Sequence, residues 1–365
     1  MTEPGRGARL KLGTRGSQLA LFQANTVSAL LCANPGIECE IVVIKTSGDR
    51  LAEATIAEIG GKRLFVKEIE DALLAGEIDL AVHSSKDMPV VLPEGLAIGA
   101  ALPREDARDA VVLPAGSARV PASASSESAE ASARPRQSAP KAREGERRRA
   151  DASGTSVTFD ELAARLGSTP RIGTSSVRRT AQLTRLFPGA RFLPIRGNLD
   201  TRLRKLDEGG YDALVLASAG LVRLGHRARI SAALPIPTCV PAPGQGIIAI
   251  EVRATDGRMM SRVAAIDDRT SRAALDAERT VVTRLGGGCQ MPIGAYADVS
   301  GDALTLVAIV LSLDGAQVLR AESRGPMSEA IAVGNAVAED LLAQGAAGIL
   351  ADIERAHAAV EGLQP

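Results

Sequence analysis

A single cysteine in a glycine-rich segment is the most unusual candidate for chemistry in this chain. Cys289 stands in the run GGGCQMPIG, whose glycines allow the backbone to approach a bulky group. An inert buried cysteine and a hydrolase nucleophile are the usual interpretations of such a residue. A nucleophile needs a nearby general base, and no His or Asn pattern points to one. Permanent attachment of a group through a thioether is therefore a third interpretation.

A second candidate lies in the run AVHSSKDMP, where an apolar strand becomes polar at its end. Pro89 forces an extended exit from this segment. Reactive groups of α/β folds commonly follow strand ends of this kind. Asp87 is accordingly a candidate catalytic carboxylate, although an ordinary turn carboxylate beside a solvated Lys86 is the alternative.

Arginines recur where a strand signal gives way to a helix signal. The runs GTRGS, GTSSVRR and RGNLDTR each combine glycine, a hydroxyl or amide and arginine, and Arg223 follows an apolar strand. Helix N-termini attract anions, and arginine binds carboxylates with two donors. The spacing of a Walker A loop is absent, which favours small carboxylates over nucleotide phosphates. We expect a cleft that binds several carboxylates, with capped helices and solvent-facing arginines as the alternative.

These residues need a scaffold of alternating strands and helices, which the first 252 residues predict. Strands are expected at 10–13, 41–45, 78–82, 95–101, 109–113, 171–172, 191–195, 213–216 and 247–252, with helices between several of them, including 17–31 and 65–75. The pattern predicts two α/β units. Between them, residues 121–156 contain no Val, Ile, Leu, Met or aromatic residue, which predicts a disordered insertion at about 115–156. A basic tether for an acidic partner is the alternative.

The pattern changes after residue 252. A long helix at 269–285 leads into the segment with Cys289, strands follow at 295–299 and 304–311, and helices at 328–342 and 346–360 close the chain. This order predicts a smaller α+β domain. We expect domain 1 to comprise residues 1–105 and 236–252, domain 2 residues 106–235, and domain 3 residues 253–365.

Composition excludes several classes of protein. The 365 residues carry no net charge and only seven aromatic side chains, which argues against nucleic-acid binding. The four cysteines form no CxxC pair and lie apart from the three histidines, so no metal site is expected. No leader or apolar span is recognisable, and we expect a cytoplasmic protein with no membrane partner. The chain holds seven lysines and 36 arginines, a bias that genomic composition explains as well as function does.

Taken together, seven motifs resemble the porphobilinogen deaminase, or hydroxymethylbilane synthase, family. They are GTRGSQLAL, GGKRLFVKE, VHSSKDMP, GTSSVRR, RGNLDTRL, PAPGQG and RLGGGCQMPIGAY, in that order. The resemblance covers nearly the whole chain apart from its first residues and the insertion. It implies an α/β protein with two domains like periplasmic binding proteins and a smaller α+β C-terminal domain. It also implies a monomeric transferase of tetrapyrrole biosynthesis.

The chemistry implied by this resemblance is stepwise. A dipyrromethane cofactor is joined to Cys289, four porphobilinogen molecules are added head to tail with loss of ammonia, and hydrolysis releases hydroxymethylbilane. Asp87 is implied as the carboxylate that stabilises the azafulvenium cation left when ammonia departs. The residues implied to bind pyrrole carboxylates are Arg15, Ser17, Ser84, Lys86, Thr174, Ser175, Ser176, Arg178, Arg179, Arg196, Arg202 and Arg223.

A loop over the cleft is implied to contain Lys62 and Phe65. The sequence departs from the family pattern there: Arg63 replaces a glycine that commonly follows the lysine, and Glu58 stands where a basic residue is often found. Two other functions compete with this reading. A non-catalytic binder of an anion would use the same arginines but has no use for Cys289, and a different cysteine-dependent transferase would lack two attached pyrroles.

Overall fold

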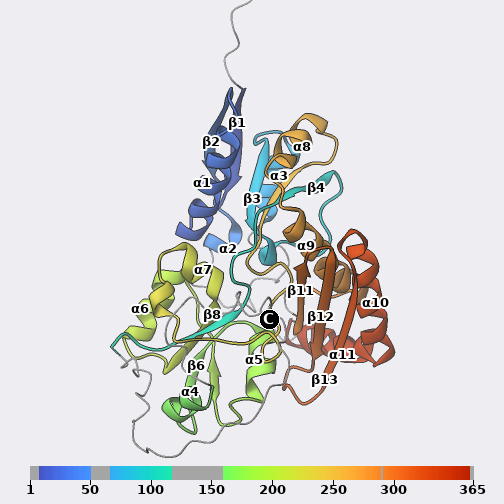
Figure 1. The fold of residues 1–365 in the computed structure, drawn as a ribbon. Coiled ribbons are helices and arrows are strands. Elements are labelled where there is room, and N and C mark those ends of the chain that lie inside the picture. The colour runs from blue at the N-terminus through green and yellow to red at the C-terminus, as the bar shows by residue number, and fades with distance from the viewer. Residues whose placement is uncertain (1–7, 51–65, 117–158, 289–290, 362–365) are drawn as a thin grey trace, which may run out of the picture.

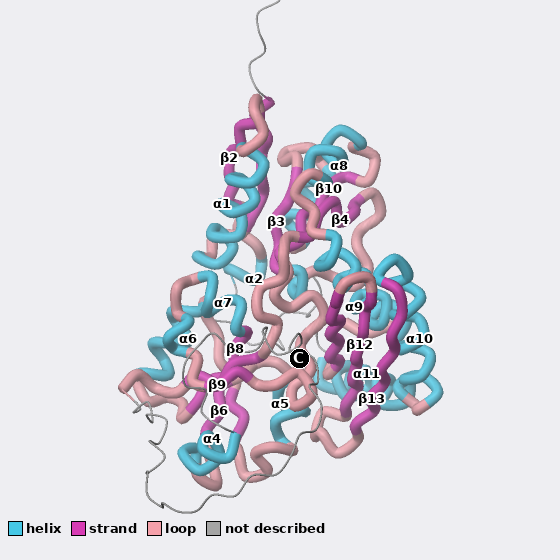
Figure 2. Tube along the Cα trace, in the orientation of Figure 1, coloured by secondary structure: helices cyan, strands magenta, loops and turns pink. Residues whose placement is uncertain are grey.

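A computed structural model of the chain describes residues 8–50, 66–116, 159–288 and 291–361. Three β-sheets organise these residues, two of them mixed and five-stranded and one antiparallel and three-stranded. Figure 1 shows the first sheet above the second and the third beside both, and Figure 2 shows helices covering each of them. The expected α/β fold class with a smaller α+β unit is confirmed.

The first sheet has the strand order β2-β1-β3-β10-β4. Its strands form where apolar residues alternate or run together: Leu10 and Leu12 are buried in β1, and β3 is apolar throughout its first three residues. The strands are β1 (Ala8–Thr14), β2 (Ile37–Val43), β3 (Leu80–Ser84), β4 (Leu96–Ala101) and β10 (Ile248–Arg253). The accompanying helices are α1 (Gln18–Cys32), α2 (Ser47–Arg50), α3 (Lys67–Leu74) and α8 (Gly257–Ala264).

The second sheet repeats this arrangement in the order β7-β6-β8-β5-β9. In the first sheet β1 lies between its parallel neighbours β2 and β3, and in the second β6 lies between β7 and β8. An antiparallel strand, β10 or β5, then pairs with β3 or β8. The strands are β5 (Asp109–Val112), β6 (Arg171–Gly173), β7 (Arg191–Leu193), β8 (Ala213–Ala217) and β9 (Ala232–Ala233). The helices are α4 (Phe159–Leu166), α5 (Val177–Thr184), α6 (Leu199–Asp207) and α7 (Ser218–Arg223).

Two chain crossings connect the first two sheets. Residues 102–108 lead from β4 into β5, and residues 234–247 lead from β9 into β10. The inserted antiparallel strand of each sheet is therefore the strand that directly follows a crossing. The crossings are also bonded to each other, since the backbone N–H of Glu105 donates to the carbonyl of Gly246 at 3.0 Å.

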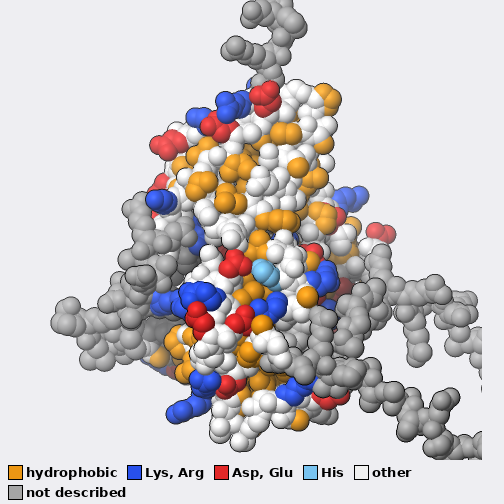
Figure 3. Space-filling view, turned by 90° about the vertical axis from the view of Figure 1, so that its left-hand side faces the viewer, with side chains coloured by type: hydrophobic (Ala, Val, Ile, Leu, Met, Phe, Trp, Pro, Cys, Tyr) orange, Lys and Arg blue, Asp and Glu red, His pale blue; other side chains and the backbone are white. Residues whose placement is uncertain are grey.

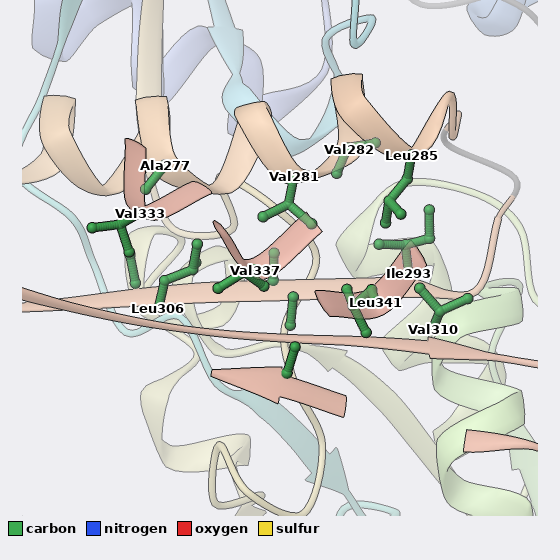
Figure 4. Packing of buried hydrophobic residues seen from close by; sticks show 14 of the residues in the cluster. Ala277, Val281, Val282, Leu285, Ile293, Leu306, Val310, Val333, Val337 and Leu341 are labelled. Atoms are coloured by element: carbon green, nitrogen blue, oxygen red, sulfur yellow. The ribbon is translucent and has the colours of Figure 1, made fainter. Parts of the chain in front are cut away.

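The third sheet packs against helices at one face. It contains β11 (Ile293–Ser300), β12 (Ala303–Leu311) and β13 (Val318–Pro326), with helices α9 (Arg269–Leu285), α10 (Ala330–Ala343) and α11 (Ala346–Glu361). Figure 4 shows apolar side chains of α9 and α10 meeting those of β11 and β12. This core fixes the end of α9, after which the chain enters the glycine-rich segment that contains Cys289.

Most of the expected elements are present, with several differences. The second strand is Ile37–Val43, earlier than the expected 41–45, because Ile37, Cys39 and Ile41 together face the apolar core. The elements that were not predicted include helix α8 and the strands β9 and β13. Strand β13 carries a single buried side chain, Ala321, and so has almost no apolar signal. Apart from its first two residues, the expected insertion at 115–156 lies outside the described residues.

The domain limits stay a prediction. One observation bears on the limit expected at residue 252. Met259 and Val263 of α8 are buried in the same apolar core as Val252 of the first sheet. Residues 257–264 thus share the core of the first sheet, although the expected limit assigns them to domain 3.

Candidate active site

The predicted site residues cluster after the carboxyl ends of parallel strands. Arg15 follows β1, the turn with Asp87 follows β3, and Thr174 follows β6. Arg196 comes shortly after β7, and Arg223 ends the helix that follows β8. Parallel strands bring such positions to one edge of each sheet, which is where α/β folds bind ligands.

The edges of the two sheets face each other. The charges of Arg178 and Arg179, at the start of α5 in the second unit, act on Lys86 in the turn after β3 of the first. The charge of Asp87 likewise acts on Arg202. Helices α1 and α7 are in contact, and a Cβ at Gly220 would lie 3.7 Å from Leu19. The structure therefore brings Asp87 and Lys86 together with the arginines of the second unit.

Asp87 ends a short 3₁₀ turn, Ser85–Asp87, that directly follows β3. Its side chain is exposed, whereas Ser85 and Met88 on either side are buried and hold the turn in place. Arg279 of α9 donates to the carbonyls of Pro89 and Val90 at 2.9 and 2.7 Å. The segment after Asp87 is thus attached to the helix that leads to Cys289.

Lys86 is a partly buried cation beside Asp87. Burial lowers the pKa of Lys86 to about 8, and the positive charges of Arg179 and Arg178 add to this effect. The negative charges of Asp87 and Asp109 act in the opposite direction. Lys86 thus has two further cations near it, and together these three groups could pair with an anionic ligand.

Arg178 and Arg179 form a buried ion cluster with Asp109, the first residue of β5. Arg178 donates to Oδ2 of Asp109 at 2.8 Å, and Arg179 donates to Oδ1 through Nε and Nη2 at 3.0 and 2.8 Å. Burial alone would raise the pKa of Asp109, but the two arginines bring it well below its usual range. Two guanidinium groups share one carboxylate, so a positive charge remains in the cluster. Both arginines are already paired, and their role in carboxylate binding stays a prediction.

Two further predicted arginines bind backbone carbonyls. Arg202 donates to Gly197 at 2.8 Å, and burial, followed by the charge of Arg179, lowers its pKa. Arg223 donates to Gly246 in the second crossing at 2.7 Å, and burial lowers its pKa as well. These bonds fix the guanidinium of Arg202 at the loop between β7 and α6 and that of Arg223 at the second crossing. Arg15 and Arg196 are described too, and each has a partner within the protein.

The predicted hydroxyl groups largely hold the local backbone. Ser17 and Ser176 are N-caps of α1 and α5, accepting from the N–H groups of Ala20 and Arg179. Ser175 joins the ends of β6 and β7 through the backbone of Ile195, at 2.7 and 3.0 Å. Ser84 contacts the amide of Gln23 in α1 at 2.8 Å, and Thr174 is buried. These contacts position the strand ends, and direct binding of a ligand by the hydroxyls remains a prediction.

The motif PAPGQG forms the end of the second crossing, and its two glycines lie against the site. Both have positive φ, 72° at Gly244 and 90° at Gly246. A Cβ at Gly244 would lie 2.4 Å from the hydroxyl of Ser85, and one at Gly246 would lie 2.3 Å from the carbonyl oxygen of Glu105. Only glycine permits this approach of the second crossing to the Asp87 turn and to the first crossing.

The sequence motifs assign no role to the residues that join the crossings. Asp109 and Gln245 bind each other at 2.9 Å, and buried Glu278 binds Arg104. Charged residues at the start of an apolar strand, as in REDARDAVV, are a signal that could have identified Asp109. Glu278 lies in an ordinary helical pattern and carries no such signal.

Several predicted residues lie outside the described part of the chain. These are Cys289 and the loop residues Lys62 and Phe65, together with Arg63 and Glu58. The structure does describe the flanks of Cys289. Gly286 caps the C-terminal end of helix α9 with a positive φ of 69°, and the N–H of Met291 donates to the carbonyl of Gly288 at 3.0 Å.

Comparison with known proteins decides the family. The family model named "Porphobilinogen deaminase, dipyromethane cofactor binding domain" matches residues 10–143 and 145–261, and the model of the C-terminal domain matches residues 273–343. The chain belongs to the porphobilinogen deaminase family. Its function is that of a hydroxymethylbilane synthase, a transferase of tetrapyrrole biosynthesis with a dipyrromethane cofactor.

Relatives named porphobilinogen deaminase match almost end to end. The protein of Trichlorobacter lovleyi is 42% identical over 94% of this chain and 96% of its own. That of Desulforudis audaxviator is 44% identical over 94% and 97%. Among solved structures, an ancestral cationic amino acid solute binding protein aligns over 75% of this chain and 94% of its own, at 14% identity and a TM-score of 0.39.

The residues around Asp87 fit a dipyrromethane cofactor. Such a group carries acetate and propionate side chains, and Lys86, Arg202 and the Asp109 cluster supply surplus positive charge near Asp87. Within the described residues, no group of three or more His, Cys, Asp or Glu side chains could hold a metal ion. No described helix is long and apolar enough to cross a membrane.

Proposed function

We propose that this chain condenses four porphobilinogen molecules, one at a time, onto a dipyrromethane held by Cys289, and then releases hydroxymethylbilane by hydrolysis. The observation that carries this assignment of residues is the placement of exposed Asp87 among paired and partly buried cations from both α/β units. We also propose that the protein acts as a monomer, because its motifs supply every expected group of the site within one chain. The cytoplasm is its proposed location.

Asp87 stabilises positive charge on the substrate. Loss of ammonia from the aminomethyl group of porphobilinogen leaves a cation conjugated with the pyrrole ring. A fixed carboxylate lowers the energy of that cation and accepts hydrogen bonds from pyrrole N–H groups. It can also accept the proton that the terminal pyrrole of the chain loses from its ring carbon once that carbon has bonded to the cation. Asp87 suits these roles because the turn that carries it is anchored on both sides while its carboxylate stays exposed.

The basic residues hold the acetate and propionate groups. Each added pyrrole brings two carboxylates, and placing them in a cleft without partners would be costly. Four described cations lie near Asp87, namely Lys86, Arg178, Arg179 and Arg202. Asp109 is the other described anion of this group. The excess of cations favours a polyanionic chain. Arg15, Arg196 and Arg223 extend the basic lining along the strand ends.

Cys289 serves as an anchor for the primer. When bound, dipyrromethane supplies the free pyrrole position that receives the first substrate unit. The protein's part is to hold the anchor near Asp87, and Arg279 supports this by joining α9 to the carbonyls of Pro89 and Val90. Lys62 and Phe65 complete the proposal as a loop over the cleft.

Intact mass spectrometry tests this proposal. Protein purified from cells that supply porphobilinogen should be heavier than its sequence mass by two condensed pyrrole units, and Cys289→Ser should lack the excess. Cys39→Ser is the matched control and should keep it, because Cys39 faces the apolar core of the first sheet. An unmodified wild-type mass would contradict the proposal, as would an excess that survives Cys289→Ser.

A further inference from the structure

Two cysteines outside the site lie on facing elements of the first α/β unit. Cys32 is the last residue of α1, and Cys39 lies in β2. A turn of four residues joins these elements, so the end of α1 lies beside the start of β2. Figure 1 shows α1 lying beside β2, with the other end of α1 next to α7 of the second unit. The deaminase chemistry proposed above uses neither cysteine.

The register of helix and strand brings the two side chains together. Cys39 shares one face of β2 with Ile37 and Ile41, and that face packs against the core to which Val27 and Leu31 of α1 belong. Cys39 lies two residues into the strand, about 7 Å along it. Ser28 precedes Cys32 by one helical turn, about 6 Å along α1. Cys39 therefore sits opposite the helix face of Ser28 and Cys32, and both of these side chains act on the pKa of its thiol.

The two thiols have different surroundings. Cys32 is exposed to solvent, and Cys39 is half-buried. Burial and the neighbouring Cys32 thiol raise the pKa of Cys39 to about 11, while Ser28 acts in the opposite direction. An exposed thiol beside a covered one is the arrangement of an attacking cysteine with a resolving cysteine.

We propose that Cys32 and Cys39 form a reversible dithiol–disulfide site that reacts with small disulfides such as oxidised glutathione. The thiolate of Cys32 attacks one sulfur of the small disulfide, which releases one small thiol and leaves a mixed disulfide on Cys32. The thiol of Cys39 loses its proton and attacks the Cys32 sulfur, releasing the second small thiol. Two electrons pass from the cysteine pair to the oxidant, and two protons end on the two small thiols.

The disulfide has a defined structural effect. It ties the C-terminal end of α1 to β2 and closes a ring of only eight residues, Cys32 to Cys39. The opposite end of the 15-residue helix, near Ser17 and Arg15, lies about 22 Å away. Oxidation should therefore raise the thermal midpoint of the protein while leaving its deaminase turnover within about twofold.

The experiment treats the full-length holoprotein with oxidised glutathione, digests it and maps disulfides by mass spectrometry. We expect a Cys32–Cys39 bond, a loss of two hydrogen atoms in the intact mass and reversal by dithiothreitol. Cys239 is an internal control, because it is fully buried and burial contributes to raising its pKa to about 12, so it should stay reduced.

Two variants separate the roles of the cysteines. Cys39→Ser should stop at a stable glutathione adduct on Cys32, whereas Cys32→Ser should take up glutathione at least tenfold more slowly than Cys39→Ser. Wild-type protein that ends with both thiols free, with separate glutathione adducts on each, or with bonds between two chains would overturn the proposal. The readout does not depend on turnover, so it is independent of the assignment of Asp87 and Cys289.

Discussion

Glu278 of α9 accepts two hydrogen bonds from the guanidinium of Arg104 in the first crossing, at 2.6 and 3.1 Å. The same fully buried carboxylate accepts from the N–H of Gly244 in the second crossing at 2.6 Å and from that of Ala297 in β11 at 2.7 Å. One carboxylate therefore joins both crossings to the third sheet. Arg104 also lies 4.8 Å from the centre of the Tyr296 ring, which adds a cation–π contact.

Replacing Glu278 should loosen this junction. Glu278→Gln removes the buried charge that compensates partly buried Arg104 and substitutes one N–H donor for an acceptor, so we expect a loss of about 3–5 kcal/mol in the free energy of unfolding. Glu339→Gln is the control, because its contact with Arg284 is longer, 3.8 Å, and exposed, and should change stability by less than about 1 kcal/mol. Urea denaturation measures both. Equal effects of the two substitutions would contradict a structural role for the Glu278 junction.

The cluster of Asp109 should behave in the same way for a different reason. Asp109→Asn leaves Arg178 and Arg179 buried without their counter-ion, and we expect a loss of about 3–5 kcal/mol. Because the low folded pKa of Asp109 stabilises the protein only while its carboxylate is ionised, the difference between wild type and variant should shrink as pH falls toward and below the ordinary aspartate pKa.

Asp212→Asn provides the control for that measurement. Asp212 binds Arg171 with similar geometry, 2.8 Å, but both side chains are more than one-third exposed. Its loss should cost less than about 1 kcal/mol. A pH-independent difference between wild type and Asp109→Asn would show that the charge of Asp109 is not what stabilises the cluster.

The sequence predicted the scaffold better than the pairing of its charges. Helix α9 has the expected bounds because a regular apolar stripe and a terminal glycine mark both its face and its end. Strand β13 was missed because Ala321 alone is buried. The arginines of GTSSVRR were expected to face a ligand, but their partner Asp109 lies about 70 residues away in the chain. Local patterns indicate which element carries a charged side chain, whereas the partner of that side chain depends on the tertiary structure.

Lys86 predicts a pH dependence of substrate binding. Its folded pKa is about 8, so the ammonium group is present below that pH and is lost above it. If Lys86 holds a pyrrole carboxylate, KM for porphobilinogen should rise by up to about tenfold between pH 7 and 10. Lys86→Arg keeps its charge through this range and should lose that inflection. Steady-state kinetics across the range measure the effect, and an unchanged inflection in the arginine variant would assign it to another group.

The approach of the two crossings can be tested at Gly246. Gly246→Ala places a Cβ 2.3 Å from the carbonyl oxygen of Glu105, in addition to the strain of a φ of 90°. Gly36→Ala is a matched control with a φ of 83° and no atom within 4 Å of the new Cβ. The control should lose about 1–2 kcal/mol from backbone strain alone. Gly246→Ala should lose about 1–3 kcal/mol more, because the crossings must separate.

Asp87 offers the most direct test of the chemistry. Asp87→Asn keeps the size of the side chain but removes the charge that stabilises the substrate cation, and kcat should fall by about 100-fold to 10,000-fold. The side chain is exposed, so the variant should fold normally. Asp302→Asn, at an exposed turn of the third sheet, should keep wild-type kcat. Stopped-flow mixing with porphobilinogen followed by intact mass analysis should show Asp87→Asn protein that carries the primer but adds substrate units slowly. Rapid addition followed by slow release of the tetrapyrrole would instead place Asp87 in the hydrolytic step alone.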